Sequence, residues 1–272
     1  RSSAASDVYK RQGDILSLYI NDEFFDNNPE TEFLSVSADL NVIYEDENII
    51  LIDKKNGLVV HEDDENTADT LINRLKHYLY DKGEYVPENE NSFAPSLCNR
   101  LDRNTGGIVI AAKNAESLRI LNQKIKDREI EKKYLCITVG YPPKDEDTAT
   151  AYLEKNSDSN TVTVTSKKTN CNKTIVTKYK VLKKKNNLAL VEVELKTGRT
   201  HQIRAHMAYL GCPLLGDGKY GINKVNKEYN VKTQALYSYK LKFTFKGDNG
   251  CLDYLNNREF TVKNVWFADK FI

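Results

Sequence analysis

One segment of the chain combines acidic and cationic side chains on backbone that favours turns. Residues 100–107 read RLDRNTGG and directly precede an apolar run at residues 108–112. Asp102 lies between Arg100 and Arg103 in the sequence, and a guanidinium that approaches it in space would favour its charged form. An ionised Asp can act as a nucleophile or as an ion-pair partner, but an Asp near Gly also commonly caps a turn. These residues alone leave both roles open for Asp102.

A second segment places cationic side chains where a strand is expected to end and a helix to begin. Residues 197–206 read TGRTHQIRAH. The free N–H groups of a helix N-terminus, together with Arg199, His201 and Arg204, would suit an anion such as phosphate. Zinc is disfavoured because His201 and His206 would lie about 140° apart on a helix, with no third ligand beside them. We therefore expect no metal, and a structural role for at least one of the two histidines stays open.

Two other activities fit the sequence poorly. A glycine-rich run at residues 211–221 lacks the P-loop pattern, because Pro213 stands where a Gly is needed and Tyr220 follows the Lys. Glycosidases use two carboxylates, and no second acidic residue lies near Asp102 in the sequence. ATP hydrolysis is excluded on this basis, and glycoside hydrolysis is disfavoured.

The spacing of apolar residues predicts the elements that position these segments. A helix is expected between Thr200 and Leu210, where Gly211 and Pro213 stop it. Two amphipathic helices are expected, each with three apolar residues on one face behind a capping residue: Thr67 with Leu71, Leu75 and Leu79, and Asn114 with Leu118, Leu121 and Ile125. Strands are expected at residues 42–44, 49–52, 107–112, 134–139, 161–165, 175–181 and 189–195. This order predicts an α+β fold with a mixed, mostly antiparallel sheet flanked by helices.

The N-terminal part of the chain differs from the rest. Residues 1–12 lack periodicity and resemble translated adaptor or cloning sequence, so we leave them outside the fold. Residues 13–40 contain one expected strand, at 13–21, followed by an acidic stretch that suits a linker. The main domain is expected to span residues 41–272.

The formal net charge of +1 conceals an uneven distribution of charge. Residues 13–96 carry 20 acidic and 5 basic side chains, net −15, whereas residues 97–272 carry 18 acidic and 32 basic ones, net +14. This asymmetry favours a polyanion as partner of the basic part, although solvated Lys-rich faces would give the same count.

Composition also bears on where the protein acts. The chain has five cysteines and no C-x-x-C pair, which indicates a reducing compartment. Its longest apolar run, residues 108–112, is far shorter than the roughly 18 residues that a membrane-spanning helix needs. No secretory signal precedes the domain. We expect a cytoplasmic protein that does not enter a membrane.

Five blocks in a fixed order closely resemble the RluA/RluD-type family of RNA pseudouridine synthases. The blocks are residues 54–61 (KKNGLVVH), 100–107 (RLDRNTGG), 131–134 (EKKY), 195–206 (LKTGRTHQIRAH) and 216–221 (GDGKYG). The resemblance covers about residues 41–268. Residues 13–20 are similar to the last strand of the small alpha-L RNA-binding domain that often precedes this catalytic domain. A truncated remnant of that domain is expected there, and a longer chain is expected to bind RNA more tightly.

The resemblance implies roles for individual residues. Asp102 would be the nucleophile that attacks the target uridine, Arg204 would hold it by a salt bridge, and Tyr134 would stack on the flipped uracil and could take the proton from C5. The N1–C1′ bond would break and the base would rejoin through C5, without cofactor or metal. The side chains implied to contact RNA are Arg100, Arg103, Lys133, Arg199, His201 and Gln202.

The resemblance also implies the partner and leaves questions open. RNA is the expected substrate, with 23S rRNA favoured over tRNA, and the protein is expected to be a monomer. An RNA-binding ribosome-assembly factor with little or no turnover remains the alternative. Many family members have His where this chain has Asn99, Ser where it has Gly106, and His where it has Tyr237. These departures leave Asp102 and its implied partners in place.

Overall fold

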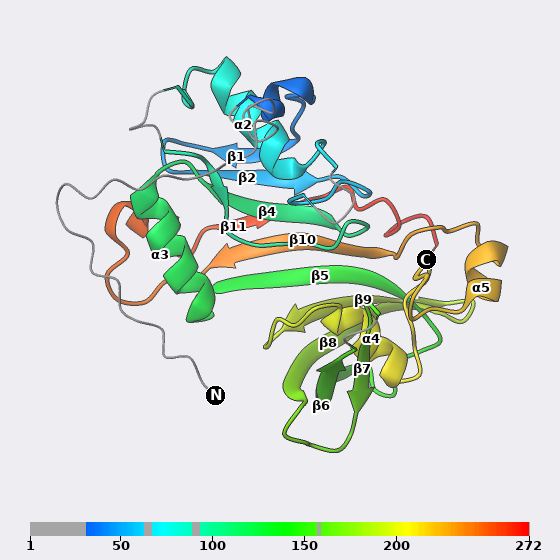
Figure 1. Ribbon diagram of the computed structural model, residues 1–272. Coiled ribbons are helices and arrows are strands. Elements are labelled where there is room, and N and C mark those ends of the chain that lie inside the picture. Colours follow the sequence, from blue (N-terminus) through cyan, green and yellow to red (C-terminus); the bar gives the residue numbers. More distant parts are fainter. Residues whose placement is uncertain (1–30, 63–66, 89–92, 157–158, 272) are drawn as a thin grey trace, which may run out of the picture.

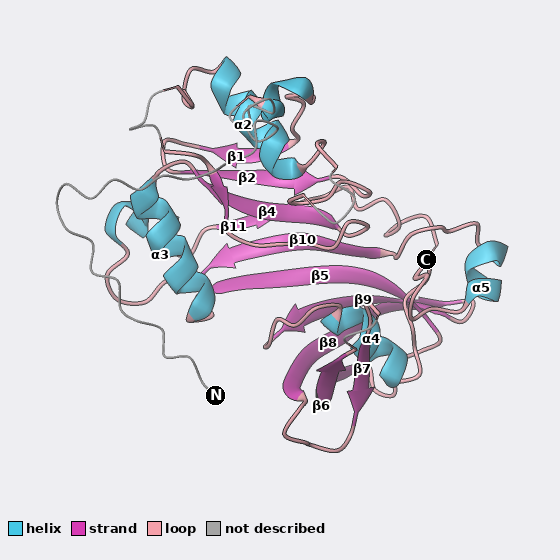
Figure 2. Cartoon of the chain, in the orientation of Figure 1, coloured by secondary structure: helices cyan, strands magenta, loops and turns pink. Residues whose placement is uncertain are grey.

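A single sheet of eleven strands forms the centre of the protein, seen in a computed structural model that describes residues 31–62, 67–88, 93–156 and 159–271 (Figure 1). The strand order is β1-β2-β4-β10-β5-β9-β8-β6-β7, with β3 beside β4 and β11 beside β10. Among the described strands, the β4–β10 pair is parallel and the other pairs are antiparallel. The predicted α+β fold with a mixed, mostly antiparallel sheet is confirmed (Figure 2).

The strands predicted at 42–44, 49–52, 107–112, 134–139, 175–181 and 189–195 lie within strands of the structure, several of which are longer. The strand predicted at 161–165 begins one residue later, at Val162, and the strands at 96–97, 146–155, 236–243 and 259–261 were not predicted. The strands are β1 (Val42–Glu45), β2 (Ile49–Lys54), β3 (Ser96–Leu97), β4 (Gly106–Ala112), β5 (Ile130–Val139), β6 (Glu146–Lys155), β7 (Val162–Thr165), β8 (Lys173–Lys185), β9 (Leu188–Leu195), β10 (Leu236–Phe243) and β11 (Glu259–Thr261). The helices are α2 (Leu71–Asp81), α3 (Ala115–Lys126), α4 (Gln202–Tyr209) and α5 (Asn223–Glu228), with 3-10 turns η1 (Glu32–Ser35) and η2 (Gly250–Leu255). None of the described helices is long and apolar enough to cross a membrane.

The caps of the first two helices were only partly predicted. The Asn114 side chain accepts a hydrogen bond from the Ser117 amide and begins α3, as expected. Helix α2 begins after Thr70, whose hydroxyl accepts from the Asn73 amide at 3.2 Å, so the prediction of Thr67 as its cap is wrong. A capping oxygen must reach an amide of the first helical turn. Thr70 directly precedes that turn and reaches the Asn73 amide, whereas Thr67 lies three residues farther from the helix.

Alternate residues of β2 build two separate cores, because successive side chains of a strand point to opposite faces. Ile49 and Leu51 pack against α3, and Ile50 and Ile52 pack against α2. The two helices therefore cover opposite faces of the sheet.

Strand β5 divides its side chains in the same way. Tyr134 and Cys136 pack with Ile203 and Met207 of α4, whereas Leu135 and Ile137 pack on the opposite face with Phe267. Ile130 shares a face with Tyr134 and packs in the core that α3 covers. Helices α3 and α4 therefore flank one face of the sheet, and the loop that carries Asp102 reaches this face through Leu101.

Some residues before position 41, where the main domain is predicted to begin, also pack against the described core. Phe33 in η1 is buried against α2 and the core beneath it. The predicted strand at 13–21 and the segment 1–12 lie outside the described residues. The division at residues 12 and 40 stays a prediction.

Candidate active site

Asp102 lies on a short loop between β3 and β4, where the backbone is fixed before the side chain is considered. The Thr105 amide donates to the Asp102 carbonyl at 3.0 Å and closes a turn. The neighbouring Arg103 carbonyl accepts hydrogen bonds from the Gly57 amide and from the Lys54 ammonium, each at 3.0 Å. The Asp102 side chain remains 33% exposed. The loop therefore holds a carboxylate at the surface on a rigid backbone.

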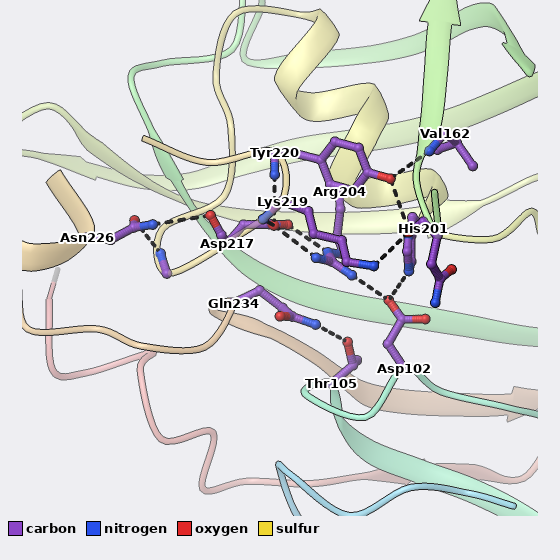
Figure 3. A network of polar contacts seen from close by, with 12 residues as sticks. Asp102, Thr105, Val162, His201, Arg204, Asp217, Lys219, Tyr220, Asn226 and Gln234 are labelled. Carbon is purple, nitrogen blue, oxygen red and sulfur yellow. Dashed lines mark hydrogen bonds and ion pairs between the residues drawn. The ribbon is translucent and has the colours of Figure 1, made fainter. Parts of the chain in front are cut away.

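The charge partner of Asp102 is Arg204, not one of its neighbours in the sequence. Arg204 Nη1 donates to Asp102 Oδ2 at 3.1 Å, across 102 residues of chain (Figure 3). Among the described residues, Asp102 pairs with Arg204 and lies 3.9 Å from His201 Nε2, and neither Arg100 nor Arg103 takes part. The expectation that Arg204 holds Asp102 agrees with this geometry.

A second carboxylate fixes Arg204 in turn. Arg204 Nε and Nη2 donate to the two oxygens of Asp217 at 2.6 and 2.9 Å, a bidentate pair in which the arginine side chain is 7% exposed and the aspartate side chain 0%. The Asp217 carboxylate also accepts from the Lys219 and Tyr220 amides. This arrangement directs Nη1 of Arg204 at Asp102. The guanidinium is paired with two carboxylates, so it is not available to bind an RNA phosphate.

Burial and pairing act in opposite directions on this pair. Burial alone would lower the pKa of Arg204, but its hydrogen bonds and charge contact with Asp217 raise it above the ordinary value. Burial would raise the pKa of Asp217, but Arg204 and the backbone amides lower it below the ordinary value. Both groups are therefore charged at neutral pH, and Arg204 presents a permanent positive charge to Asp102.

His201 lies near the same oxygen of Asp102 that Arg204 binds, and Tyr220 lies behind His201. His201 Nε2 is 3.9 Å from Asp102 Oδ2, and its Nδ1 is 2.9 Å from the Tyr220 hydroxyl. That hydroxyl accepts the Val162 amide at 2.9 Å, and the Arg204 guanidinium lies 5.3 Å from the centre of the Tyr220 ring. Figure 3 shows Arg204 and His201 directed at Asp102, with the Tyr220 hydroxyl between His201 and the Val162 amide of β7.

Tyr134 lines the same face from β5. It is 8% exposed, and Ser238 lies directly across from it on β10. Burial, with a further contribution from the Asp102 charge, raises the pKa of Tyr134 to about 12. The phenol is therefore protonated at neutral pH in the resting protein. An apolar ring with a protonated hydroxyl suits stacking on a base.

Lys54 supports the loop from beneath. Its side chain is 1% exposed, and its ammonium donates to the carbonyls of Lys55, Leu58 and Arg103 at 3.1, 2.7 and 3.0 Å. Burial lowers the pKa of Lys54 to about 8, although the charge of Asp102 opposes this.

The side chains predicted to contact RNA do not all point outward. Arg199 is exposed, and Lys133 is half-buried and donates to Glu192 at 2.9 Å. Gln202 is buried and bonds to the Thr197 and Thr177 hydroxyls, the Val176 carbonyl and the Arg199 amide, so its amide orders the loop from within. Arg100 and Arg103 flank Asp102 on its loop, and both are exposed.

Three residues of this site received no role from the sequence: Asp217, Tyr220 and Lys54. Each lies in a block that carried the family resemblance, Lys54 at residues 54–61 and the other two at 216–221. The available signal was an Asp in a glycine-rich turn and a Lys at the end of an apolar strand. Neither pattern distinguishes a buried pair from an exposed charge, because the partners lie far away in the sequence.

Two of the three positions at which this chain differs from many family members, Gly106 and Tyr237, lie in contact. A Cβ atom at Gly106 would lie 2.4 Å from Tyr237 Cε2, so the tyrosine ring fills the space of a side chain at position 106. The Tyr237 hydroxyl donates to Asp53 Oδ1 at 2.5 Å. Asn99 Oδ1 accepts the Ile110 amide at 2.9 Å, and its buried Nδ2 has no partner among the described residues.

The second histidine of the segment is structural. His206 is fully buried, its Nδ1 is 2.9 Å from the Thr177 hydroxyl, and burial lowers its pKa to about 4. In the described parts of the chain, no group of three or more His, Cys, Asp or Glu side chains is placed to hold a metal ion.

The structure also bears on the glycosidase alternative. It brings Asp217 to the site as a second carboxylate, but this residue is fully buried and bound on both oxygens. Its pKa lies below the ordinary value, because pairing with Arg204 outweighs the effect of burial. Asp217 therefore cannot serve as the general acid that two-carboxylate hydrolysis requires.

Solved structures define the class of fold. The protein is similar to the solved structure named Human RNA Pseudouridylate Synthase Domain Containing 4, with a TM-score of 0.64 and 21% identity over 89% of this chain and 93% of that one. A nearly equal likeness holds for Human RNA Pseudouridylate Synthase Domain Containing 1, with a TM-score of 0.62, 20% identity and coverage of 83% and 91%. The fold is that of pseudouridylate synthase domains.

Sequence comparison then gives the family. The model of the family described as RNA pseudouridylate synthase matches residues 48–209. The protein named Ribosomal large subunit pseudouridine synthase D of Borreliella burgdorferi is 33% identical over 230 residues, which cover 85% of this chain and 68% of that relative. The chain belongs to the RNA pseudouridine synthase family, with relatives of the RluA/RluD type, and is an RNA pseudouridine synthase.

Proposed function

We propose that this enzyme converts specific uridines of structured RNA to pseudouridine, with large-subunit ribosomal RNA as its favoured substrate and Asp102 as its nucleophile. The observation that carries the proposal is the part-exposed Asp102 carboxylate held by the buried Arg204–Asp217 pair. A nucleophile must be ionised and reachable, and Asp102 is the carboxylate of this network that remains partly exposed to solvent.

The proposed reaction needs no atoms beyond those of the substrate. Asp102 attacks C1′ of the target uridine as the N1–C1′ bond breaks, which leaves the sugar esterified and frees the uracil as an anion. The base turns, C5 bonds to C1′ as the carboxylate departs, and the product loses the C5 proton while N1 gains one. The product is an isomer of the substrate, so no cofactor is required.

Tyr134 serves this scheme as the stacking partner of the flipped base and as the acceptor of the C5 proton. Its high pKa in the resting protein derives mainly from burial and partly from the Asp102 charge. Esterification of Asp102 would remove that charge and so lower the Tyr134 pKa during the reaction. A lower pKa would let the phenol release its own proton to N1 of the uracil, and the resulting phenolate would accept the proton that leaves C5.

The target base must leave its helix to reach this site, because enzymes that act on a base inside a duplex flip it out. Arg100 and Arg103 on the Asp102 loop, with Arg199 at the start of the α4 segment, are the proposed contacts to the surrounding RNA. Lys133 and His201 complete this set, and Gln202 contributes by holding Arg199. Phosphate contacts of this kind would make binding weaken as the salt concentration rises.

Large-subunit rRNA is favoured because two relatives have the words "ribosomal large subunit" in their names. They are the protein from Borreliella burgdorferi and the Ribosomal large subunit pseudouridine synthase C of Rickettsia bellii. The Rickettsia protein is 37% identical over 185 residues, which cover 68% of this chain and 58% of that relative. Transfer RNA is the second candidate. Sequencing-based mapping of pseudouridine in a deletion strain would separate the two.

The nucleophile is tested by incubating rRNA and tRNA transcripts with the protein and with Asp102→Asn, followed by chemical mapping of pseudouridine. We expect product with the wild type and a loss of more than about 10⁴-fold with the variant, the scale on which loss of a nucleophile is felt. Product from Asp102→Asn at a comparable rate would refute the assignment. No product from either protein on cellular RNA would favour the assembly-factor alternative.

A further inference from the structure

His201 occupies an unusual backbone position directly beside the proposed nucleophile. It precedes the first residue of α4 with φ of 53° and ψ of 18°, in the left-handed region, and its side chain does not cap the helix. Such a conformation is uncommon for a residue other than glycine and persists where the surroundings determine it. The surroundings here are Tyr220 on one ring nitrogen and Asp102 on the other.

The hydrogen bonds of Tyr220 favour the His201 tautomer that carries its proton on Nε2. The Val162 amide can only donate, so the Tyr220 oxygen accepts in that contact, at 2.9 Å. The phenolic hydrogen is then left for His201 Nδ1, which lies 2.9 Å from the same oxygen. An Nδ1 that accepts a hydrogen bond has no proton, so a neutral ring carries its proton on Nε2.

The protonated nitrogen faces one oxygen of Asp102 only. His201 Nε2 is 3.9 Å and Arg204 Nη1 is 3.1 Å from Oδ2. Within the described residues, no hydrogen bond or ion pair engages Oδ1 of Asp102. The two oxygens of the carboxylate are therefore in different environments. Oδ2 accepts the Arg204 hydrogen bond and has His201 Nε2 at 3.9 Å, beyond hydrogen-bond distance, whereas Oδ1 is open.

We propose that Tyr220 and His201 are positioning residues that hold Oδ2 of Asp102 and leave Oδ1 as the oxygen that attacks C1′. The inference rests on the proposed function of Asp102 as nucleophile. Tyr220 fixes the His201 tautomer with its proton on Nε2, so an N–H rather than a lone pair faces Oδ2 beside the Arg204 hydrogen bond. A lone pair there would repel the carboxylate, whereas the N–H favours the orientation of the carboxylate plane in which the open oxygen points outward.

Burial is the main cause that favours the neutral form of His201. Burial lowers the pKa of His201, and the positive charges of Arg204 and Lys219 lower it further, whereas Asp102 and Asp217 oppose them. The net result lies below the ordinary value, so the ring is neutral at the pH of an assay near 7.5. A neutral ring needs its tautomer fixed, which the Tyr220 hydroxyl provides.

The β6–β7 hairpin is the outer anchor of this arrangement. Val162 is the first residue of β7, paired with Lys155 of β6, and its amide holds the Tyr220 hydroxyl. The Lys219 ammonium donates to the Asn160 carbonyl at 2.6 Å in the same hairpin. The position of this hairpin is thereby connected to the orientation of Asp102 through Tyr220 and His201.

Nitrogen-15 NMR of the histidine rings in the full chain tests the tautomer without any substrate. The chain has four histidines, and the His201→Gln variant identifies the His201 signals. We expect His201 to be neutral with its proton on Nε2 in the wild type, and to populate the Nδ1-protonated form in Tyr220→Phe. A wild-type ring with its proton on Nδ1 would overturn the proposal.

Single-turnover kinetics test the consequence for the reaction, on a transcript that the wild-type protein modifies. Tyr220→Phe should lower the rate of the bound complex by about 10- to 100-fold, as misplacement of a reacting group does, and change RNA affinity less than about twofold. His201→Gln, which keeps an N–H donor of similar reach, should retain more activity than His201→Leu. Equal rates for these two His201 variants, or a wild-type rate for Tyr220→Phe, would refute the positioning role.

The controls separate this proposal from the function on which it rests. Tyr209→Phe makes the same chemical change on α4 at an exposed side chain, and should leave the rate and the His201 signals unchanged. An active Asp102→Asn would refute the nucleophile itself. An inactive Asp102→Asn with a fully active Tyr220→Phe would refute the positioning pair alone.

Discussion

Two buried cations support the loop that carries Asp102, and their surroundings differ. Arg204 contacts the Asp102 side chain and is neutralised by the fully buried Asp217. Lys54 contacts the loop backbone through the Arg103 carbonyl, and its three hydrogen-bond acceptors are neutral carbonyls. Arg204 is therefore paired with carboxylates. Lys54 lies among carbonyl dipoles, and Asp102 is the charge that raises its pKa.

The consequence is opposite shifts of the pKa. Pairing with Asp217 outweighs burial and raises the pKa of Arg204, whereas burial dominates at Lys54 and lowers its pKa to about 8. Arg204 therefore supplies a permanent charge, while Lys54 can lose its proton within an ordinary experimental range of pH. Arg204 keeps its charge because a carboxylate is buried with it, whereas Lys54, buried without one, holds its proton less firmly.

The largest effect is expected from Asp217→Asn, which makes Arg204 resemble Lys54. The variant would leave the guanidinium buried with only the part-exposed Asp102 as its carboxylate partner. Removal of one partner of a buried ion pair costs about 3–5 kcal/mol, so the free energy of unfolding should fall by that amount in urea denaturation.

The matched control for that variant is Asp269→Asn, the same change at an exposed position. A surface substitution of this kind should alter the unfolding free energy by less than about 0.5 kcal/mol. A loss below about 1 kcal/mol for Asp217→Asn would show that Asp102 alone neutralises Arg204, and the contrast with Lys54 would fail.

Lys54→Met should change how stability depends on pH. Between about pH 8, the folded pKa of Lys54, and 10.5, its ordinary value, the unfolded chain binds more protons than the folded protein. Stability contributed by this group therefore rises with pH across that window. The unfolding free energy of the wild type, minus that of the variant, should increase by up to roughly 3 kcal/mol between pH 8 and 10.5.

Taking the difference between the two proteins removes the contributions of all other groups that titrate in this range. Lys183→Met, at an exposed lysine of β8, is the control, and its difference from the wild type should stay flat. Parallel curves for the wild type and Lys54→Met would mean that the buried lysine keeps its proton as firmly as Arg204 keeps its own.

The same comparison explains what could be predicted from the sequence. The spacing of apolar residues predicted the hairpin of β1 and β2, helix α3 with its Asn114 cap, and strands β4 and β5 of the site, but not β3 or β10. These features depend on neighbours within a few residues. The pairing of Arg204 with Asp102 was expected from the family resemblance, since local sequence favoured Arg100 or Arg103 instead.

The supports of the site could not be predicted in this way. Asp217 was part of a recognised block, but whether its carboxylate is buried depends on Arg204 and on amides of its own loop. Lys54 reads as the end of a strand, and only the folded chain brings the Arg103 carbonyl to its ammonium. Burial of a charge is a property of tertiary packing, so a linear pattern gives no signal for it.

The smallest expected change in stability concerns the contact between Gly106 and Tyr237, which supports the Asp102 loop without a buried cation. At the base of the loop, the Tyr237 ring occupies the space beside Gly106, 2.4 Å from where a Cβ atom would lie. Gly106→Ser should therefore overpack this contact and destabilise the protein by about 1–3 kcal/mol. Tyr237→His should destabilise it as well, because the hydrogen bond to Asp53 is lost and the smaller ring leaves space.

The double variant decides whether Gly106 and Tyr237 form one unit. In Gly106→Ser with Tyr237→His, the smaller ring admits the serine, so the loss of unfolding free energy should be at least about 1 kcal/mol less than the sum of the single losses. Gly218→Ser, where a Cβ meets nothing within 4 Å, should add to Tyr237→His without any such interaction. Strict additivity of Gly106→Ser and Tyr237→His would show that the two positions vary independently. A clear interaction would show that the Asp102 loop is set by steric fit at its base as well as by the two buried cations.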